Sequence, residues 1–355
     1  MFGPRGTGKS TLVKTKHKTH ILIDLLDPGV YRQYFTYPER LKELIEANKK
    51  TKTFIIDEVQ KVPQLLSVVH QLIETNKELQ FILTGSSARK LKQAGVNLLA
   101  GRAQLKFLHP FMAAEIANSF NLEQNLKIGM LPLIYNSVEP RLDLKAYVAL
   151  YMLEAISFSQ GSIINYSNIA RDCHVSSKTV ENYINILEDL LLSFRINIFD
   201  KRAKRILSNH PKFYFFDCGV FQTIRPMGPL DSVDVVAGQT LETLVAEHLR
   251  AWLDYSNQDG KLYFWRTKSG LEVDFIVYGE IGFYAMEVKN SNKIDHKDLT
   301  SLKEFKKDYP DSKCIFLYRG KEKRLINEIL CLPVDNFLLS LEPNTSKLQS
   351  ILHSI

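Results

Sequence analysis

The sequence is poor in cysteine and tryptophan, and it contains no long hydrophobic run. Its 355 residues include four cysteines and two tryptophans. The cysteines are far apart and form no C-x-x-C pair, which argues against a disulfide framework or a zinc site. No apolar stretch approaches the ~18–20 residues that a membrane-spanning helix needs. We therefore expect a reduced, cytoplasmic protein that does not enter a membrane.

The remaining composition is that of an ordinary globular protein, with 45% hydrophobic and 24% charged residues. The length predicts two or three domains, because single cores stop growing beyond roughly 250–300 residues. The net charge of +7 favours a polyanionic partner such as DNA. Many proteins of this charge bind no nucleic acid, so the charge only supports such an interpretation.

Residues 3–10 read GPRGTGKS and fit the phosphate-loop pattern G-x-x-x-x-G-K-[ST] at every position. The glycines let backbone N–H groups turn inward around phosphate oxygens, the lysine adds a positive charge, and the serine hydroxyl ligates Mg²⁺. The pattern predicts binding of ATP with Mg²⁺. The predicted nucleotide contacts are Gly3, Pro4, Arg5, Gly6, Thr7, Gly8, Lys9, Ser10 and Thr11.

Two further segments follow this loop in the order that nucleotide hydrolysis requires. Residues 53–58 form an apolar strand that ends in Asp57 and Glu58. Asp57 is predicted to hold the magnesium ion, and Glu58 to polarise the attacking water. A second apolar strand, residues 81–84, has a polar end suited to sensing the γ-phosphate. Arg102 is either an arginine finger or a surface arginine; a finger acting between subunits would require a homo-oligomer.

The first third of the chain alternates short β-rich runs with helical patterns. Strands are predicted at residues 20–25, 53–56 and 81–84, and helices at 39–48 and 63–74. This alternation is typical of a parallel α/β sheet. Residues 111–160 carry helical periodicity broken by glycine and prolines, which predicts a small helical lid or linker.

Residues 161–216 predict a helix-turn-helix followed by two strands that form a wing, at 194–199 and 212–216. Ser177, Lys178 and Asn182 lie on the outward face of the second helix, where Ser and Asn read base edges and Lys contacts phosphate. The alternative is a protein-binding or lid module, since Glu181 lies on the same face. The predicted wing adds four basic residues for phosphate contacts: Lys201, Arg202, Lys204 and Arg205.

The last third of the chain has an acidic pattern on two neighbouring strands. Because alternate residues share one face of a strand, Glu287 and Lys289 are expected to project together, with Asp274 facing them from the next strand. Glu242, on the preceding helix, completes the set. This arrangement suits a metal-dependent nuclease, in which carboxylates hold Mg²⁺ and lysine assists the attacking water. The alternatives are a solvated sheet face and a site that binds without cleaving.

These segments together resemble bacterial and archaeal AAA-type ATPases whose uncharacterised C-terminal domain is similar to restriction-endonuclease-like nucleases. The resemblance covers nearly the whole chain and implies ATP binding, a winged helix and a nuclease-like α/β fold. It divides the chain into five parts: an AAA-type core at 1–110, a lid at 111–160, a winged helix-turn-helix at 161–216, a nuclease-like domain at 217–325 and a tail at 326–355.

The chain departs from this family before the phosphate loop, where relatives have a helix and a strand but only Met1 and Phe2 precede the loop here. We expect the neighbouring strands to lose ladder partners and the loop to be weakly anchored. Two explanations stay open: a start further upstream, or a decaying copy. The favoured function is an ATPase coupled to DNA; the alternative is a non-catalytic DNA- or protein-binding switch with vestigial sites.

Overall fold

The computed structural model describes residues 1–17, 19–85, 103–140, 143, 151–173, 175–200, 211–227, 232–267 and 269–352. The chain divides into two compact units. The first comprises Met1–His109 with Asn185–Leu192, and the second Pro110–Ile184 with Ser193–Ile355. None of the helices within these residues is long and apolar enough to cross a lipid bilayer.

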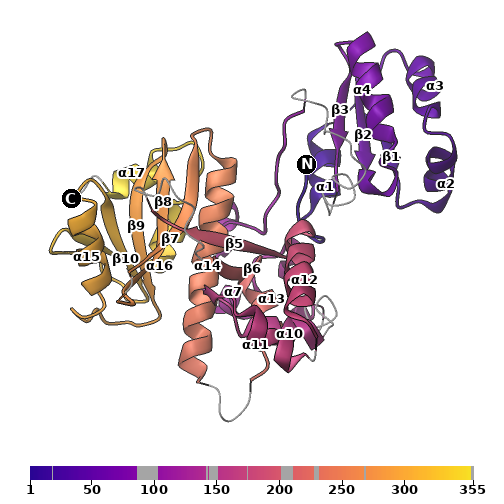
Figure 1. The fold of residues 1–355 in the computed structure, drawn as a ribbon. Coiled ribbons are helices and arrows are strands. Elements are labelled where there is room, and N and C mark those ends of the chain that lie inside the picture. The colour runs from indigo at the N-terminus through magenta and orange to yellow at the C-terminus, as the bar shows by residue number, and fades with distance from the viewer. Residues whose placement is uncertain are drawn as a thin grey trace. The chain divides into compact units, whose positions relative to one another are not determined.

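The first unit is built on a parallel sheet in the order β1-β2-β3 (Figure 1). Apolar side chains of β2 are fully buried, and Ile56 pairs with Ile23 on one side and Leu83 on the other. The predicted parallel α/β arrangement is therefore confirmed. Its elements are β1 (Ile21–Asp24), β2 (Thr53–Asp57), β3 (Gln80–Leu83), α1 (Lys9–Lys16), α2 (Pro28–Thr36), α3 (Arg40–Ala47), η1 (Val59–Lys61) and α4 (Leu65–Thr75).

Helix α2 was not predicted, although its start carries a clear local signal. The Asp27 side chain accepts hydrogen bonds from the N–H groups of Gly29 and Val30, and Pro28 occupies the first turn. An N-cap acid followed by proline is a common helix start, because proline lacks only an N–H that the first turn leaves unpaired. The helix is short and exposes most of its residues, so hydrophobic periodicity gave little indication of it.

Phe2 takes the position of a strand on the far side of β3. It forms parallel bridges to Gly85 and to Phe107. Its N–H donates to Lys106 O at 2.8 Å, and its carbonyl accepts from Leu108 N at 2.7 Å. A cavity of about 730 Å³ continues from this point along β3. Phe2 therefore supplies part of the backbone pairing that we expected to be lost. The apolar residues of β3 beside the cavity stay partly exposed.

The second unit contains a nine-stranded mixed sheet in the order β11-β12-β10-β9-β8-β7-β5-β6-β4. Strands β5 and β7 pair in parallel through Ile198 and Phe264, which joins two smaller sheets into one. The strands are β4 (Ser162–Ile163), β5 (Ser193–Ile198), β6 (Lys212–Phe215), β7 (Gly260–Arg266), β8 (Glu272–Gly279), β9 (Gly282–Lys289), β10 (Lys313–Tyr318), β11 (Arg324–Ile326) and β12 (Ile329–Pro333).

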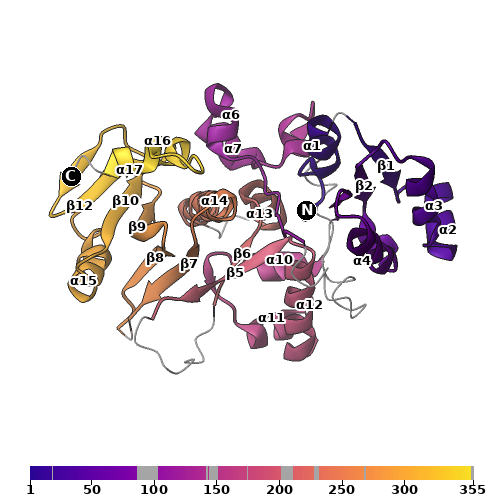
Figure 2. The same cartoon turned by 90° about the horizontal axis from the view of Figure 1, so that it is seen from above.

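Helices cover both faces of this sheet. The 23-residue helix α14 (Val233–Tyr255) packs with α16 (Val334–Ser340) on the face that carries Phe275 and Met286. Helix α15 (Thr300–Asp308) packs on the opposite face against Ile276. Because neighbouring residues of a strand point to opposite faces, β8 and β9 contribute to both cores. Figure 2 shows α14 nearly end-on beside the strands.

The other helices of this unit are α6 (Ala113–Ile116), η3 (Ala117–Ser119), α7 (Leu122–Ile128), α8 (Pro132–Tyr135), α10 (Tyr151–Ser157), α11 (Tyr166–Asp172), α13 (Cys218–Ile224) and α17 (Lys347–Leu352). Helix α12 (Ser177–Asp189) begins in this unit, and its residues from Asn185 onward belong to the first unit. Helices α11 and α12 occupy the segment in which a helix-turn-helix was predicted, and β5 pairs with β6 where two strands were expected. That these elements form a winged helix stays a prediction. The predicted boundary at 216/217 falls inside one compact unit. The segment predicted as a tail supplies β12 and the buried residues of α16.

Candidate functional site

The phosphate loop closes around the side chain of Lys9, the first residue of α1. Its Nζ donates to the carbonyl oxygens of Gly3 at 2.8 Å and Pro4 at 2.9 Å. Gly6 and Gly8 have φ values of 83° and 82°, a region that glycine enters without steric cost. The loop therefore has the bend, and the centrally placed ammonium, that a bound phosphate chain requires.

Asp57, at the end of β2, lies directly against this loop. The Ser10 hydroxyl donates to Asp57 Oδ2 at 2.5 Å, and the hydroxyl of Thr84, which follows β3, donates to Oδ1 of the same carboxylate. Only 2% of Asp57 is exposed. A hydroxyl and a carboxylate oxygen are the hard ligands that Mg²⁺ prefers, so the residues present fit this ion.

Glu58 follows Asp57 with φ 58° and ψ 43°, the left-handed region that residues other than glycine rarely adopt. Its carboxylate accepts a hydrogen bond from the side-chain amide of Gln60. Strained backbone of this kind costs about 1–3 kcal/mol and often occurs at functional positions. Gln60 was missed from the sequence, because nothing in its local pattern distinguishes it from an ordinary residue of a short turn.

The electrostatics of this region centre on Lys9. Burial lowers the pKa of the Lys9 ammonium, whereas the charges of Glu58 and Asp57 raise it and oppose the effect of burial. In the described part of the chain this buried ammonium has two backbone carbonyls as hydrogen-bond partners, and it gains a stronger, charged partner when a phosphate binds. The loop is thus arranged to favour an anion.

Residues 1–117 match a family model described as an AAA domain. The N-terminal part of the chain is an AAA-type P-loop domain. Within this AAA domain the structure brings the phosphate loop, Asp57, Glu58 and Thr84 together at the carboxyl ends of β2 and β3. Arg102, the predicted arginine finger, and the serines at 86 and 87 lie outside the described residues.

The rest of the chain matches two models, each described as a domain of unknown function: DUF8612 over residues 139–231 and DUF4143 over residues 237–337. Uncharacterized proteins of Mycobacterium tuberculosis and Mycobacterium bovis are each 21% identical over 95% of this chain and 80% of their own length. An uncharacterized protein of Haemophilus influenzae is 20% identical over 52% of this chain and 55% of its own.

Among solved structures, a protein of Vibrio cholerae aligns with 95% of this chain and 98% of its own, at 11% identity. The TM-score of 0.25 is too low to support any statement about a shared fold or function.

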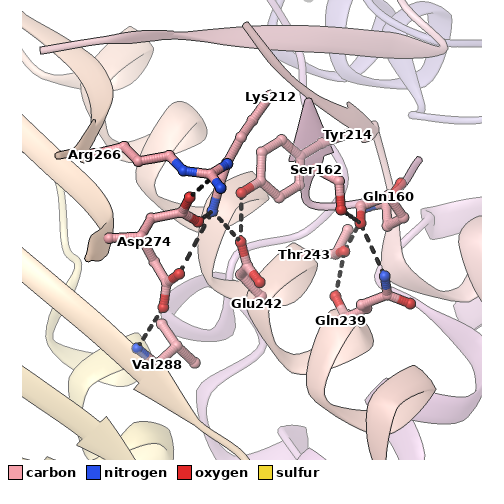
Figure 3. A network of polar contacts seen from close by, with 11 residues as sticks. Gln160, Ser162, Lys212, Tyr214, Gln239, Glu242, Thr243, Arg266, Asp274 and Val288 are labelled. Carbon is pink, nitrogen blue, oxygen red and sulfur yellow. Dashed lines mark hydrogen bonds and ion pairs between the residues drawn. The ribbon is translucent and has the colours of Figure 1, made fainter. Parts of the chain in front are cut away.

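A second polar cluster lies in the second unit, called the C-terminal unit from here on, and joins residues from three elements (Figure 3). Lys212 of β6 places its Nζ 3.3 Å from Glu242 of α14. The same nitrogen lies 2.5 Å from Glu272 and 3.6 Å from Asp274, both on β8. Tyr214 donates to Glu242 Oε1 at 2.6 Å. The side chain of Lys212 is only 3% exposed, so this is a buried ion cluster.

The structure places Lys289 away from the lysine position that the pattern predicted. The Lys289 side chain is 50% exposed, and its Nζ lies 3.2 Å from Asp298. The lysine among the carboxylates is instead Lys212, which the sequence reasoning missed because it stands 62 residues before Asp274 (274 − 212) on another strand. The sequence did carry one indication of this role, because Lys212 begins the apolar run KFYF of β6. Every residue of this run is buried.

Burial and mutual repulsion raise the pKa of the two inner carboxyl groups of this cluster, Asp274 and Glu287. Burial raises the pKa of Asp274 to about 7, with the charge of Glu242 adding to the rise and Lys212 opposing it. Burial, followed by the charge of Asp274, raises the pKa of Glu287 well above its ordinary value. Glu287 Oε2 is buried and has no hydrogen-bond partner among the described residues.

This acidic cluster does not fit a divalent metal ion as it stands. Among the residues that the structure describes, no three His, Cys, Asp or Glu side chains are grouped so as to hold a metal. The carboxylates of Glu242, Glu272 and Asp274 are directed at an ammonium group instead. Trp265 of β7 is 6% exposed and packs edge-on against Phe305 in the core.

The predicted DNA-contacting residues of α12 are exposed. Ser177, Lys178 and Asn182 all lie at the surface in the first turns of the helix. Lys178 Nζ is 3.0 Å from Glu181, and the Lys178 side chain is 74% exposed. An exposed pair of this kind contributes only about 0–1 kcal/mol, so it does not prevent Lys178 from contacting phosphate. The predicted basic residues Lys201, Arg202, Lys204 and Arg205 lie outside the described residues.

Proposed function

We propose that the AAA domain binds Mg-ATP and hydrolyses it to ADP and phosphate. The observation that carries this proposal is the hydrogen bond from Ser10 to Asp57 beside the loop that encloses Lys9. These three side chains come from a helix start and a strand end that only the folded sheet brings together. They supply the charge and the oxygen ligands that phosphate with magnesium requires.

Each residue has a distinct part in this proposal. The loop N–H groups and Lys9 bind the phosphates, and Ser10 with Asp57 would hold the magnesium ion, which neutralises phosphate charge. Glu58, anchored by Gln60, accepts a proton from the attacking water. Thr84 fixes the orientation of Asp57. Arg102 remains the proposed arginine finger.

Two substitutions separate binding from hydrolysis. Lys9→Ala is expected to weaken binding of a fluorescent ATP analogue at least ~10-fold, since a buried charge contact is lost. Glu58→Gln is expected to bind nucleotide normally and to release phosphate ~10²–10⁴-fold more slowly, because an amide cannot accept the proton. Lys14→Ala, on an exposed position of the same helix, is the matched control and keeps wild-type values.

The proposal fails if well-folded protein binds no Mg-ATP, or if Lys14→Ala and Lys9→Ala behave alike. Binding without hydrolysis in the wild type supports the alternative of a non-catalytic switch. If Arg102 acts on a neighbouring subunit, mixing the inactive Glu58→Gln and Arg102→Ala variants restores part of the turnover. If mixing restores no turnover, Arg102 either acts on the phosphate loop of its own subunit or is not an arginine finger.

We further propose that α11, α12, β5 and β6 form a winged helix that binds DNA, and that the C-terminal sheet is nuclease-like in fold. The exposed Ser177, Lys178 and Asn182 support the first part. Lys178→Ala should weaken binding of a labelled duplex and reduce the slope of log K against log salt by about 1. The proposal does not include DNA cleavage, because Lys212 occupies the acidic cluster.

A further inference from the structure

Lys212 is bound by carboxylates from two elements that lie far from it in sequence. Its ammonium lies between Glu242 of α14 and the pair Glu272 and Asp274 of β8, at nitrogen–oxygen distances of 3.3, 2.5 and 3.6 Å. The nitrogen is also 5.6 Å from the centre of the Phe264 ring, which adds a cation–π contact. The ammonium donates a hydrogen bond to Glu242, and the charges of Glu272 and Asp274 surround it on the other side.

The carboxylates are themselves fixed in this orientation. Tyr214 donates to Glu242 at 2.6 Å, and the backbone N–H of Val288 donates to Asp274 Oδ2 at 2.9 Å. Arg266 lies 3.6 Å from the outer oxygen of Glu272. Figure 3 shows the contacts of Tyr214 with Glu242 and of Val288 with Asp274 on either side of the Lys212 nitrogen. Carboxylates held in this way cannot turn freely toward another cation.

Gly161 limits the cluster on another side. It has φ 64°, and a Cβ atom at this position would lie 3.2 Å from Glu242 Oε2. The chain thus passes close to the carboxylate without covering it with a side chain. A divalent cation needs oxygen ligands at about 2.0–2.6 Å. The lysine nitrogen occupies the position between the carboxylates that such a cation would need.

We infer that Lys212 is an internal counter-ion that takes the place of a divalent cation in the acidic cluster and keeps such cations out. The cluster gathers several carboxylates, and their charge is already compensated by a side chain of the same chain. Glu287, with one buried oxygen lacking a hydrogen-bond partner in the described structure, is a further ligand that becomes useful only when the ammonium is absent. This inference does not depend on nucleotide binding.

The test is to remove the charge of Lys212 and measure Mn²⁺ binding without nucleotide. Lys212→Met keeps a long unbranched side chain and removes the ammonium. We expect Lys212→Met to gain one Mn²⁺ site, at least tenfold tighter than any in the wild type, by calorimetry and by electron paramagnetic resonance. Adding Asp274→Asn to this variant should abolish the new site. Lys289→Met, which removes an exposed lysine of the neighbouring strand β9, is the matched control and should bind as the wild type does.

Two results would overturn the inference. One is a wild-type protein that binds Mn²⁺ in the micromolar range at a site lost on Asp274→Asn. The other is a folded Lys212→Met variant that gains no site. Tryptophan fluorescence checks folding, since both tryptophans lie in this unit.

A second measurement on the wild type covers the case in which Lys212→Met does not fold. The side-chain ¹⁵N resonance of the buried ammonium, assigned by its loss in Lys212→Arg, should persist when Mn²⁺ is added. Broadening of this resonance at low Mn²⁺ concentration places the metal beside Lys212 and refutes the inference.

Discussion

Replacing His248 should remove one specific part of the pH dependence of stability of the C-terminal unit. The His248 ring is buried in α14, where Nε2 accepts from the backbone N–H of Ala113 at 2.9 Å. Nδ1 lies 2.7 Å from the carbonyl of Leu244 and therefore carries the proton. Both ring nitrogens are used by the neutral form, and burial lowers the pKa of His248 to about 4.

The magnitude follows from this value and the ordinary histidine pKa of about 6.5. Between the two values the unfolded chain binds a proton at this residue and the folded chain does not, so stability falls as the pH falls. The stabilisation that the neutral His248 ring gives the folded state is complete above pH ~6.5 and is lost toward pH ~4. The part lost between pH ~7 and ~5 amounts to about 2 kcal/mol.

Other buried groups near α14 act in the opposite direction. Burial raises the pKa of Asp217 to about 6 and the pKa of Glu247 well above its ordinary value. These carboxyl groups take up protons in the folded state first, so they add stability as the pH falls. The pH dependence of the unfolding free energy of the wild type therefore contains both effects. Only a comparison with a variant separates the contribution of His248.

The assay is urea unfolding of the wild type and His248→Gln, followed by tryptophan fluorescence. Glutamine can accept the hydrogen bond from Ala113 but cannot titrate. Both tryptophans of the chain, Trp252 and Trp265, are buried in the C-terminal unit, so the signal reports on that unit. We expect the stability advantage of the wild type to shrink by about 2 kcal/mol from pH ~7 to ~5. A pH-independent advantage, or one that grows on acidification, would refute the reasoning.

Two further substitutions test the packing around the sites. Asp217→Asn should lower the free energy of unfolding by about 1–3 kcal/mol. The two carboxylate oxygens of Asp217 accept backbone hydrogen bonds from Met130 at 2.7 Å and from Val220, and the amide group of asparagine has only one oxygen to accept them. A loss below ~0.5 kcal/mol in urea unfolding contradicts this. Gly3→Ala should abolish nucleotide binding, because its Cβ would lie 2.2 Å from the carbonyl oxygen of Leu108. Gly238→Ala, with open space around it, is the control and should bind as the wild type; equal affinity in Gly3→Ala would show that the loop can shift.

The phosphate loop could be predicted because its chemistry is contiguous. Eight successive residues specify the backbone turn, the charge and the metal ligand, and no distant residue is needed to recognise them. The strand that ends in Asp57 and Glu58 could be predicted for the same reason, because both acids directly follow a continuous apolar run. The left-handed backbone of Glu58 and its contact with Gln60 were not predictable, because they result from how the turn after β2 packs.

The acidic cluster shows where local patterns stop being sufficient. Strand alternation correctly places Asp274 and Glu287 beside each other on paired strands. The same alternation predicted Lys289 as their partner, but it gives only the direction in which a side chain leaves the strand. The long Lys289 side chain instead reaches Asp298, while Lys212 enters from β6.

The sequence by itself determined the parallel α/β core of the AAA domain, the phosphate loop and the positions of several strands and helices, because hydrophobic period and turn chemistry act over a few residues. Tertiary structure alone decided that β5 joins β7 to make one sheet, and that Lys212 therefore lies among the carboxylates. The reason is that strand order and the partner of a buried charge depend on free energies shared by residues dozens of positions apart. No local pattern contains that information.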